Sequence, residues 1–288
     1  MRGIRITVLA IAALLAVGSQ IVSVRAQRPV ASTELPDTVD VLVREMANSM
    51  GMLRGRSNQD TAAVDSTLTL EHWASGSLLV GGQRFDVPEY RMSLNYSYPG
   101  MREDFTLAES TGASERRIEV VSGDASWNET ERGMNATLAP GQLSERLVRL
   151  WTTPYGVVKA AALAGSFATM ETLGGEAAVL SFPLPDPVSD VTVHATVRKD
   201  ASLVVPHPEA LADLVGIYIV KVETEGGIVS DTTYAEYGDQ NWDDYRADIM
   251  LPKRIVRTQG ETTLMLTTVN TNTYNPYVVM PVPEHIGQ

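Results

Sequence analysis

The segment from Asp239 to Asp243 carries the residue types that open a calcium-binding loop. Its sequence, Asp-Gln-Asn-Trp-Asp, places an acidic or amide side chain at positions one, three and five. The sixth position of such a loop needs glycine for a sharp turn, and here it is Asp244. The twelfth position needs a bidentate glutamate, and here it is Met250. The segment therefore predicts a solvated acidic turn between two strands and not a metal site.

Hydrolytic chemistry requires groupings that the sequence lacks. Neither a Gly-x-Ser-x-Gly elbow nor a His-x-His-x-Asp-His motif occurs, and the four histidines are scattered as His72, His194, His207 and His285. The absence of cysteine excludes disulfides and thiolate metal sites. His194 falls inside a predicted strand, which favours a partnered sheet residue over a catalytic base. We therefore assign no catalytic residue, no metal and no cofactor, and keep an unrecognised hydrolase as the last of three hypotheses.

The residues best suited to contact an apolar ligand are aromatic: Trp73, Trp127, Trp151 and Tyr155. If a helix and a sheet face each other across a cavity, we expect Trp127, Trp151 and Tyr155 to line its mouth. Large rings provide apolar contact there at a small cost in conformational entropy. Ordinary core packing between helix and sheet is the alternative, because aromatic residues are also prominent in protein cores.

Strands rich in Val, Ile, Thr and Tyr must position these residues. Four of them organise the C-terminal half, with glycine-containing turns typical of hairpins: Ile217–Thr224, Ile228–Tyr237, Tyr245–Thr258 and Thr262–Thr271. Earlier in the chain, alternation predicts an antiparallel meander through Ser66–Phe105, Met101–Leu107, Arg117–Val121 and Ala125–Asn128. Further strands are predicted at Ala177–Phe182, Val191–Arg198 and Ser202–Val205.

Two segments have helical periodicity. Apolar residues recur at intervals of three and four over Val39–Leu53, which predicts an amphipathic helix whose methionines are either core or an adaptable binding surface. A second helical region, Leu143–Leu163, is interrupted near Thr153, and Pro154 suits the first turn of the restarted helix. The predicted fold class is α+β, mostly β: a curved antiparallel sheet, or half-open barrel, covered by two helical segments.

The first 26 residues have the pattern of a cleaved secretory signal, with an early basic residue, Arg5, an apolar run from Val8 to Val17, and small residues before Gln27. The run is shorter than the roughly 20 residues that span a bilayer, although a retained anchor is the alternative. We predict export to the periplasm, or secretion, by a bacterium, and a single domain at residues 27–288.

The net charge of the chain disfavours some classes of binding partner. The whole chain has a net charge of −12, and residues 1–26 hold three of its 23 basic and none of its 35 acidic residues, so the mature chain has −15. Such a chain repels phosphate backbones and anionic membrane surfaces. We expect no nucleic-acid binding and transient membrane proximity at most.

Four motifs occur in order along the chain: VSGDASWN at 121–128; LWTTPYG at 150–156 with KAAAL at 159–163; DYR at 244–246 with LPKRIV at 251–256 and QG at 259–260; and a closing segment from Val269 to Pro283. Together they resemble an exported bacterial domain often found ahead of metallo-β-lactamase-fold hydrolases, over roughly Ser66 to His285. The strand and helix pattern also resembles the periplasmic carrier and outer-membrane receptor of lipoprotein sorting, which are half-open barrels around an apolar cavity.

The sequence departs from the family pattern at several positions. Leu251 stands where the family has phenylalanine, Tyr155 where it has histidine, and Val205–Leu214 replaces a shorter segment. No hydrolase domain follows Gln288, so we expect the hydrolytic activity that accompanies the family domain elsewhere to be missing. The resemblance implies a non-enzymatic module for a hydrophobic ligand such as a lipid or a lipoprotein acyl chain. The alternative is an accessory domain that docks onto a separately encoded hydrolase.

Overall fold

The computed structural model describes residues 34–53, 67–204, 215–227, 229–241 and 249–286. They belong to one compact unit, Thr33–Gln288. The predicted signal at residues 1–26, His207 and the second half of the acidic segment, Trp242 to Asp244, lie outside the described residues.

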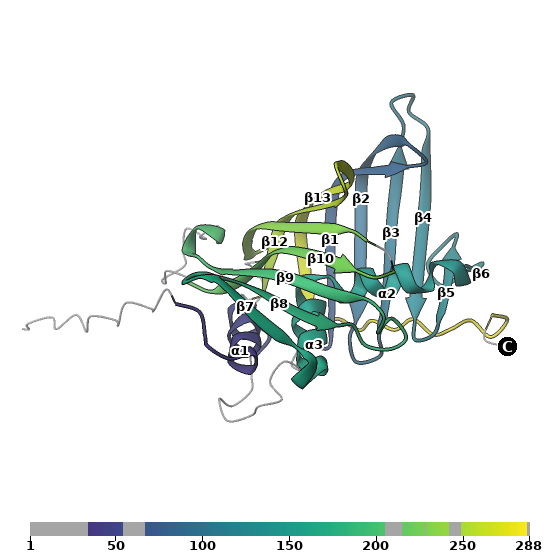
Figure 1. The fold of residues 1–288 in the computed structure, drawn as a ribbon. Helices are drawn as coiled ribbons and strands as arrows, with labels where there is room; N and C mark the ends of the chain where they lie inside the picture. Colours follow the sequence, from purple (N-terminus) through teal and green to yellow (C-terminus); the bar gives the residue numbers. More distant parts are fainter. Residues whose placement is uncertain (1–33, 54–66, 205–214, 228, 242–248, 287–288) are drawn as a thin grey trace, which may run out of the picture. The chain divides into compact units, whose positions relative to one another are not determined.

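Within the described residues, thirteen antiparallel strands form one sheet that does not close into a barrel (Figure 1). Their bounds are β1 (Thr69–Val80), β2 (Gln83–Asn95), β3 (Gly100–Ala108), β4 (Ser114–Ser122), β5 (Ala125–Glu129), β6 (Thr137–Leu138), β7 (Thr169–Gly174), β8 (Ala177–Pro183), β9 (Thr192–Lys199), β10 (Ile217–Glu225), β11 (Asp231–Asp239), β12 (Met250–Gln259) and β13 (Thr262–Tyr274). Across the sheet the strands lie in the order β6-β5-β4-β3-β2-β1-β13-β12-β11-β10-β9-β8-β7. Almost every strand therefore pairs with its neighbour in sequence, and the exception is the pair β1–β13.

Three helices lie in the chain between or before these strands: α1 (Val39–Ser49), α2 (Leu143–Trp151) and α3 (Pro154–Ala164). α2 contacts β3, β4 and β5, whereas α3 contacts β8 and both other helices. Because α2 and α3 connect the two edge strands β6 and β7, they cross the opening of the sheet. We call the face that they cover the inner face, and the predicted fold class is confirmed.

Helix boundaries follow their capping residues. The break predicted within Leu143–Leu163 is confirmed, since Pro154 begins α3 and the Thr153 side chain accepts a hydrogen bond from the Gly156 amide at 3.2 Å. The helix predicted as Val39–Leu53 ends earlier, at Ser49. Gly51 has a φ of 76°, and the amide of Met52 donates to the Ala47 carbonyl, as in a Schellman cap.

The strand predicted at Ser202–Val205 is wrong over its described residues. Ala201–Leu203 is a 3-10 turn, and Val204 makes only an isolated bridge to Tyr237. The Asp200 side chain accepts a hydrogen bond from the Ser202 amide at 2.8 Å, and such local bonds compete with a strand ladder. The four predicted C-terminal hairpin strands correspond to β10 to β13. β11 begins at Asp231 and β12 at Met250, and the predicted starts of these two strands, Ile228 and Tyr245, lie outside the described residues.

Side chains alternate between two clusters on opposite faces of the sheet. The larger cluster lies on the inner face, where the methionine stripe of α1 is buried, including Met46 and Met50. The smaller cluster on the outer face contains Ile118, Val120 and Trp127, covered by the C-terminal segment through Val278 and Met280. This segment is the yellow coil that runs past β3 to β5 in Figure 1.

Gly76 is the residue that permits β13 to cross β1 closely. It lies inside β1 beside an irregularity in the pairing with β2. A Cβ atom at Gly76 would lie 1.9 Å from the Leu266 carbonyl oxygen, far inside van der Waals contact.

We predict that Gly76→Ala lowers the free energy of unfolding by about 3 kcal/mol, because β13 must move to relieve the clash. Gly141→Ala is the matched control, since nothing lies within 4 Å of its added Cβ. Chemical denaturation of both variants measures the effect. Equal stability of the two variants would show that β1 and β13 tolerate a wider spacing.

Candidate functional site

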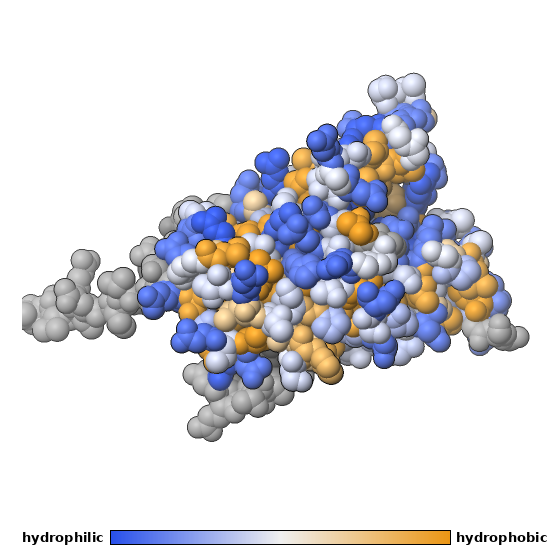
Figure 2. Space-filling view, in the orientation of Figure 1, coloured by the Kyte–Doolittle hydropathy of each residue, from blue (hydrophilic) through white to orange (hydrophobic). Residues whose placement is uncertain are grey.

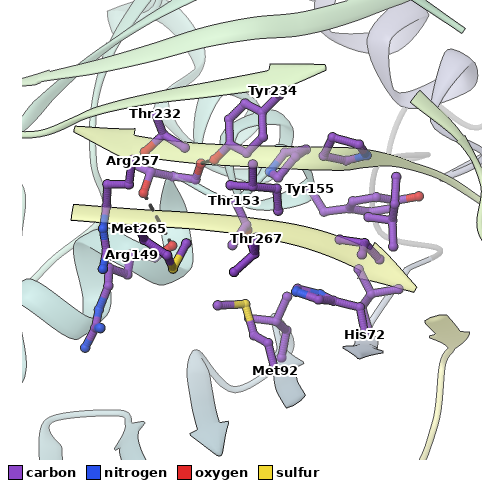
Figure 3. Close-up of a pocket in the computed structure, with 18 of the residues that line it drawn as sticks. His72, Met92, Arg149, Thr153, Tyr155, Thr232, Tyr234, Arg257, Met265 and Thr267 are labelled. Carbon is purple, nitrogen blue, oxygen red and sulfur yellow. Dashed lines mark hydrogen bonds between the residues drawn. The ribbon is translucent and has the colours of Figure 1, made fainter. Parts of the chain in front are cut away.

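A cavity of about 60 Å³ lies on the inner face, between the sheet and the junction of α2 with α3 (Figure 3). Its lining comes from both halves of the sheet, because β1–β3 and β11–β13 are joined by the pair β1–β13. The lining includes Leu70, His72, Tyr90, Met92, Leu94, Tyr96, Glu103, Arg149, Tyr155, Thr232, Tyr234, Leu251, Ile255, Arg257, Met265, Thr267 and Val269. The wall therefore combines apolar side chains with a few charged ones.

The strand register separates the apolar from the charged lining. Leu70 lies opposite Leu94 at one end, where β1 pairs with β2. Arg257 lies opposite both Met265 and Thr232 at the other end, toward the turn that joins β12 to β13. The cavity is thus apolar at the leucine end and polar at the arginine end.

An ion-pair network occupies the arginine end. Arg149 of α2 contacts Glu103 at 2.8 Å and Glu119 at 2.7 Å, and the Tyr90 hydroxyl donates to Glu103 at 2.6 Å. Burial acts to lower the pKa of Arg149, but the two carboxylates outweigh it and hold that pKa above its ordinary value. Burial and the neighbouring Glu103 raise the pKa of Tyr90, which keeps its hydroxyl protonated as a donor. Glu103 is therefore fully engaged and is a poor candidate for a general base.

Arg257 is the unmatched charge of this network. No hydrogen bond or ion pair joins its side chain to any residue that the structure describes, and its Nε atom is buried without a partner. Loss of hydration lowers the pKa of Arg257, and the nearby Arg149 lowers it further. A guanidinium nevertheless stays charged at neutral pH, because its ordinary pKa is far above 7.

His72 lies deep in the same cavity. Its side chain is buried, its Nδ1 has no hydrogen-bond partner among the described residues, and its ring lies 6.1 Å from that of Tyr90. Burial lowers the pKa of His72 from 6.5 to about 4, against a smaller raising effect of Glu71. The ring is therefore neutral at pH 7 and adds no charge to the cavity.

Two of the four residues predicted to contact a ligand lie at or beside the cavity. Tyr155 lines it, and its hydroxyl donates to the Met50 carbonyl at 2.6 Å, which fixes the ring against the end of α1. Trp151 is buried one layer away, with its ring 6.4 Å from that of Tyr96, which also lines the cavity.

The other two predicted residues lie on the outer face, so the expectation that Trp127 lines the same mouth as Trp151 is wrong. Trp127 is buried in the outer cluster, and its Nε1 donates to Glu129 at 2.9 Å. Trp73 borders a separate outer hollow of about 530 Å³, with the Arg91 guanidinium 5.1 Å from its ring centre. The physical reason is the two-residue period of a strand, which sends neighbouring side chains to opposite faces.

The outer hollow is polar, and its arginines bind carboxylates. Asp104 accepts from Arg116 at 2.8 Å and from Arg132 at 2.7 Å, while Arg91 binds Glu71 at 2.9 Å. Burial opposes ionisation of Asp104, but its two arginines outweigh burial and lower its pKa. Arg116 and Arg132 share the Asp104 carboxylate and Arg91 binds Glu71, so each arginine of this group is already engaged by a carboxylate.

The structure also brings together a serine, a histidine and a glutamate that are far apart in the sequence. Ser181 Oγ lies 2.9 Å from His194 Nδ1, and His194 Nε2 lies 3.2 Å from Glu225. The Glu225 side chain is 80 % exposed, so its charge is screened by water. Ser181 and His194 lie opposite each other in the β8–β9 ladder, whose amides are used in strand pairing and cannot form an oxyanion hole. The geometry agrees with His194 as a partnered sheet residue.

Sequence reasoning missed Arg149 and Arg257, although a signal for Arg257 exists. It follows Ile255 by two residues in β12, so it shares the inner face with an apolar residue. The role of Arg149 could not be predicted from the sequence, because its carboxylate partners, Glu103 and Glu119, lie on β3 and β4, far from Arg149 in the sequence.

Within the described residues, no group of three or more His, Asp or Glu side chains is arranged to hold a metal ion. The same residues contain no helix with the length and hydropathy of a membrane span. Comparison of the chain with models of known protein families and with curated proteins returns no match.

We predict that His72 makes folding sensitive to acid. The unfolded chain takes up a proton at His72 near pH 6.5, whereas the folded chain does so only near pH 4. Stability is therefore lost as the pH falls through this window, by about 3 kcal/mol from this residue. His72→Gln removes this component while leaving every carboxylate in place, so its unfolding free energy should fall less between pH 7 and pH 4. Denaturation at a series of pH values tests this, and parallel curves for the two proteins would contradict it.

Proposed function

We propose that this protein is a non-enzymatic exported binding module for a hydrophobic ligand, such as a lipid or the acyl chain of a lipoprotein. The observation that carries the proposal is the inner-face cavity, which has apolar walls at the leucine end and lies where α2 and α3 cross the opening of the sheet. Concave sites with mostly apolar walls and few polar groups are typical of small-molecule binding.

The cavity is small, and two features allow it to accept more than a few atoms. A neighbouring cavity of about 50 Å³ shares six lining residues with it, including Arg257, Met265 and Thr267. Met92 and Met265 line the first cavity, and the unbranched methionine side chain adapts readily to a bound apolar group. We propose that ligand entry rotates these methionines and joins the two cavities.

The proposal includes the export expected from residues 1–26 and the acidic charge of the mature chain. A net charge of −15 favours solubility and opposes binding to phosphate backbones and anionic lipid surfaces. The module therefore takes up its ligand from solution or from a carrier, with no more than transient proximity to a membrane.

One observation favours the alternative of docking onto a separately encoded hydrolase. Leu163 and Phe167 are 67 % and 76 % exposed where α3 ends, and β7 follows as an edge strand of the sheet. Figure 2 shows hydrophobic atoms exposed among hydrophilic ones on this side of the molecule. Exposed apolar side chains beside an unpaired strand edge are features of protein interfaces.

A matched pair of variants on β13 tests the binding proposal. Thr267 is buried and lines both cavities, whereas Thr268 lies on the opposite face of the same strand. Thr267→Leu adds bulk inside the cavity, so we predict at least a ten-fold drop in co-purifying apolar ligand, with about 1–3 kcal/mol lost from stability. Thr268→Leu should retain the ligand.

The measurement is mass spectrometry of the gently purified mature protein, first under native conditions and then after solvent extraction. A stoichiometric apolar molecule in the parent protein, reduced only by Thr267→Leu, would support the proposal. A ligand-free mass for all three proteins would contradict the proposal and favour docking. Docking would then be tested by asking whether a hydrolase co-purifies with the parent protein and is lost when Phe167 is replaced.

A further inference from the structure

Resting on this proposed function, we infer that the inner-face cavity binds a single-chain amphiphile with an anionic head, a carboxylate or a phosphate, whose charge is neutralised by Arg257. The inference specifies the class of ligand and its orientation. The apolar chain points to Leu70 and Leu94, and the head lies at the arginine end.

The first step of the argument is the charge count at the arginine end. Arg146, Arg149 and Arg257 carry three positive charges, and Glu103 and Glu119 carry two negative ones. Arg146 is fully buried and donates to the carbonyls of Val120 and Trp127 at 2.9 and 2.6 Å. The neutral His72 does not change the sum, and Glu145 on α2 is exposed to water, which screens it. Among the buried and half-buried side chains of this network, one positive charge is therefore left over beside the cavity.

The second step is that the surplus belongs to Arg257. Glu103 is taken by Arg149 and by Tyr90, and Glu119 is bound by Arg149. The Arg257 side chain lacks a hydrogen bond or ion pair to the described residues, while it lines both inner cavities. A guanidinium without a partner in a partly dehydrated site is costly, and an anion that accepts two of its hydrogen bonds removes that cost.

The third step is the shape and polarity around Arg257. Figure 3 shows Arg149 and Arg257 at one end of the lining residues and His72 at the other. Thr232 lies opposite Arg257 in the strand register and supplies a hydroxyl at the same end of the cavity. The remaining wall combines apolar side chains such as Leu70 and Leu94 with polar groups that are neutral at pH 7, His72 among them, so the charge is at one end only. This distribution fits an amphiphile and does not fit a ligand that is polar throughout.

A cationic head is disfavoured by the same geometry. It would meet Arg149 and Arg257, and the carboxylates that would attract it are already bound by Arg149. A neutral head would leave Arg257 uncompensated. The inner cavity therefore discriminates by charge, and this discrimination can be measured apart from hydrophobic binding.

The experiment compares four probes of equal chain length by isothermal titration calorimetry at neutral pH: octanoate, octyl phosphate, octan-1-ol and octylammonium. We expect octanoate and octyl phosphate to bind the mature protein at least about ten-fold more tightly than octan-1-ol, with octylammonium weakest. The tighter of the two anions identifies whether the head is a carboxylate or a phosphate.

Three variants test whether Arg257 is the residue that causes the preference for an anionic head. Arg257→Met keeps the length and apolar character of the side chain but removes its charge, so the anions should fall to the affinity of octan-1-ol. Arg257→Lys should restore part of the preference because it keeps the charge. Arg254→Met is the control, since Arg254 lies exposed on the same strand and outside the cavity. Thermal unfolding of each variant checks that the fold is retained.

The outcomes separate the two proposals. If all four probes bind the parent protein equally, the head-group inference is overturned and hydrophobic binding stands. If no probe binds, both fail. If Arg257→Met still prefers the anions, Arg257 does not select the head group, and the inference is overturned.

Discussion

The pairing of β1 with β13 is the constraint on which the rest of the structure depends. Every other strand pair is local in sequence, so without this pair the sheet would be two separate meanders, β1–β6 and β7–β13. The inner cavity needs both meanders, because Met92 comes from one and Arg257 from the other. Close approach at Gly76 keeps them together, and it leaves the opening between β6 and β7 that α2 and α3 cover.

Covering the opening with α2 has an electrostatic consequence. The helix brings Arg149 over the sheet, where it meets Glu103 and Glu119. Buried ion pairs of this kind contribute little net stability, because dehydration offsets most of the attraction. They do fix where charge sits inside an otherwise apolar interior. With both carboxylates bound by Arg149, the Arg257 side chain has no hydrogen bond or ion pair to the described residues, and the head-group preference that we propose rests on that imbalance.

The two faces of the sheet have different roles. On the outer face, Trp127 and the C-terminal segment form a small core, and Arg116 and Arg132 share the carboxylate of Asp104. On the inner face, packing is interrupted by a cavity, and Tyr155 anchors α3 to the end of α1 through the Met50 carbonyl. The ligand site that we propose therefore lies on the inner face, beside helices held in place by these contacts.

The sequence by itself determined most of the strands, the helix break at Pro154 and the fold class, because these depend on local periodicity, glycine turns and capping, although it predicted a strand at Ser202–Val205 and missed β6 and β7. It predicted Tyr155 near the site but placed Trp127 on the wrong side, since a one-residue difference in strand phase reverses the face. It could not reveal the surplus charge of Arg257. That property depends on which carboxylates other arginines bind, and those partners come from β3, β4 and α2, far away in the sequence. Only the tertiary structure decides such a balance, because it alone sets the distances between charges.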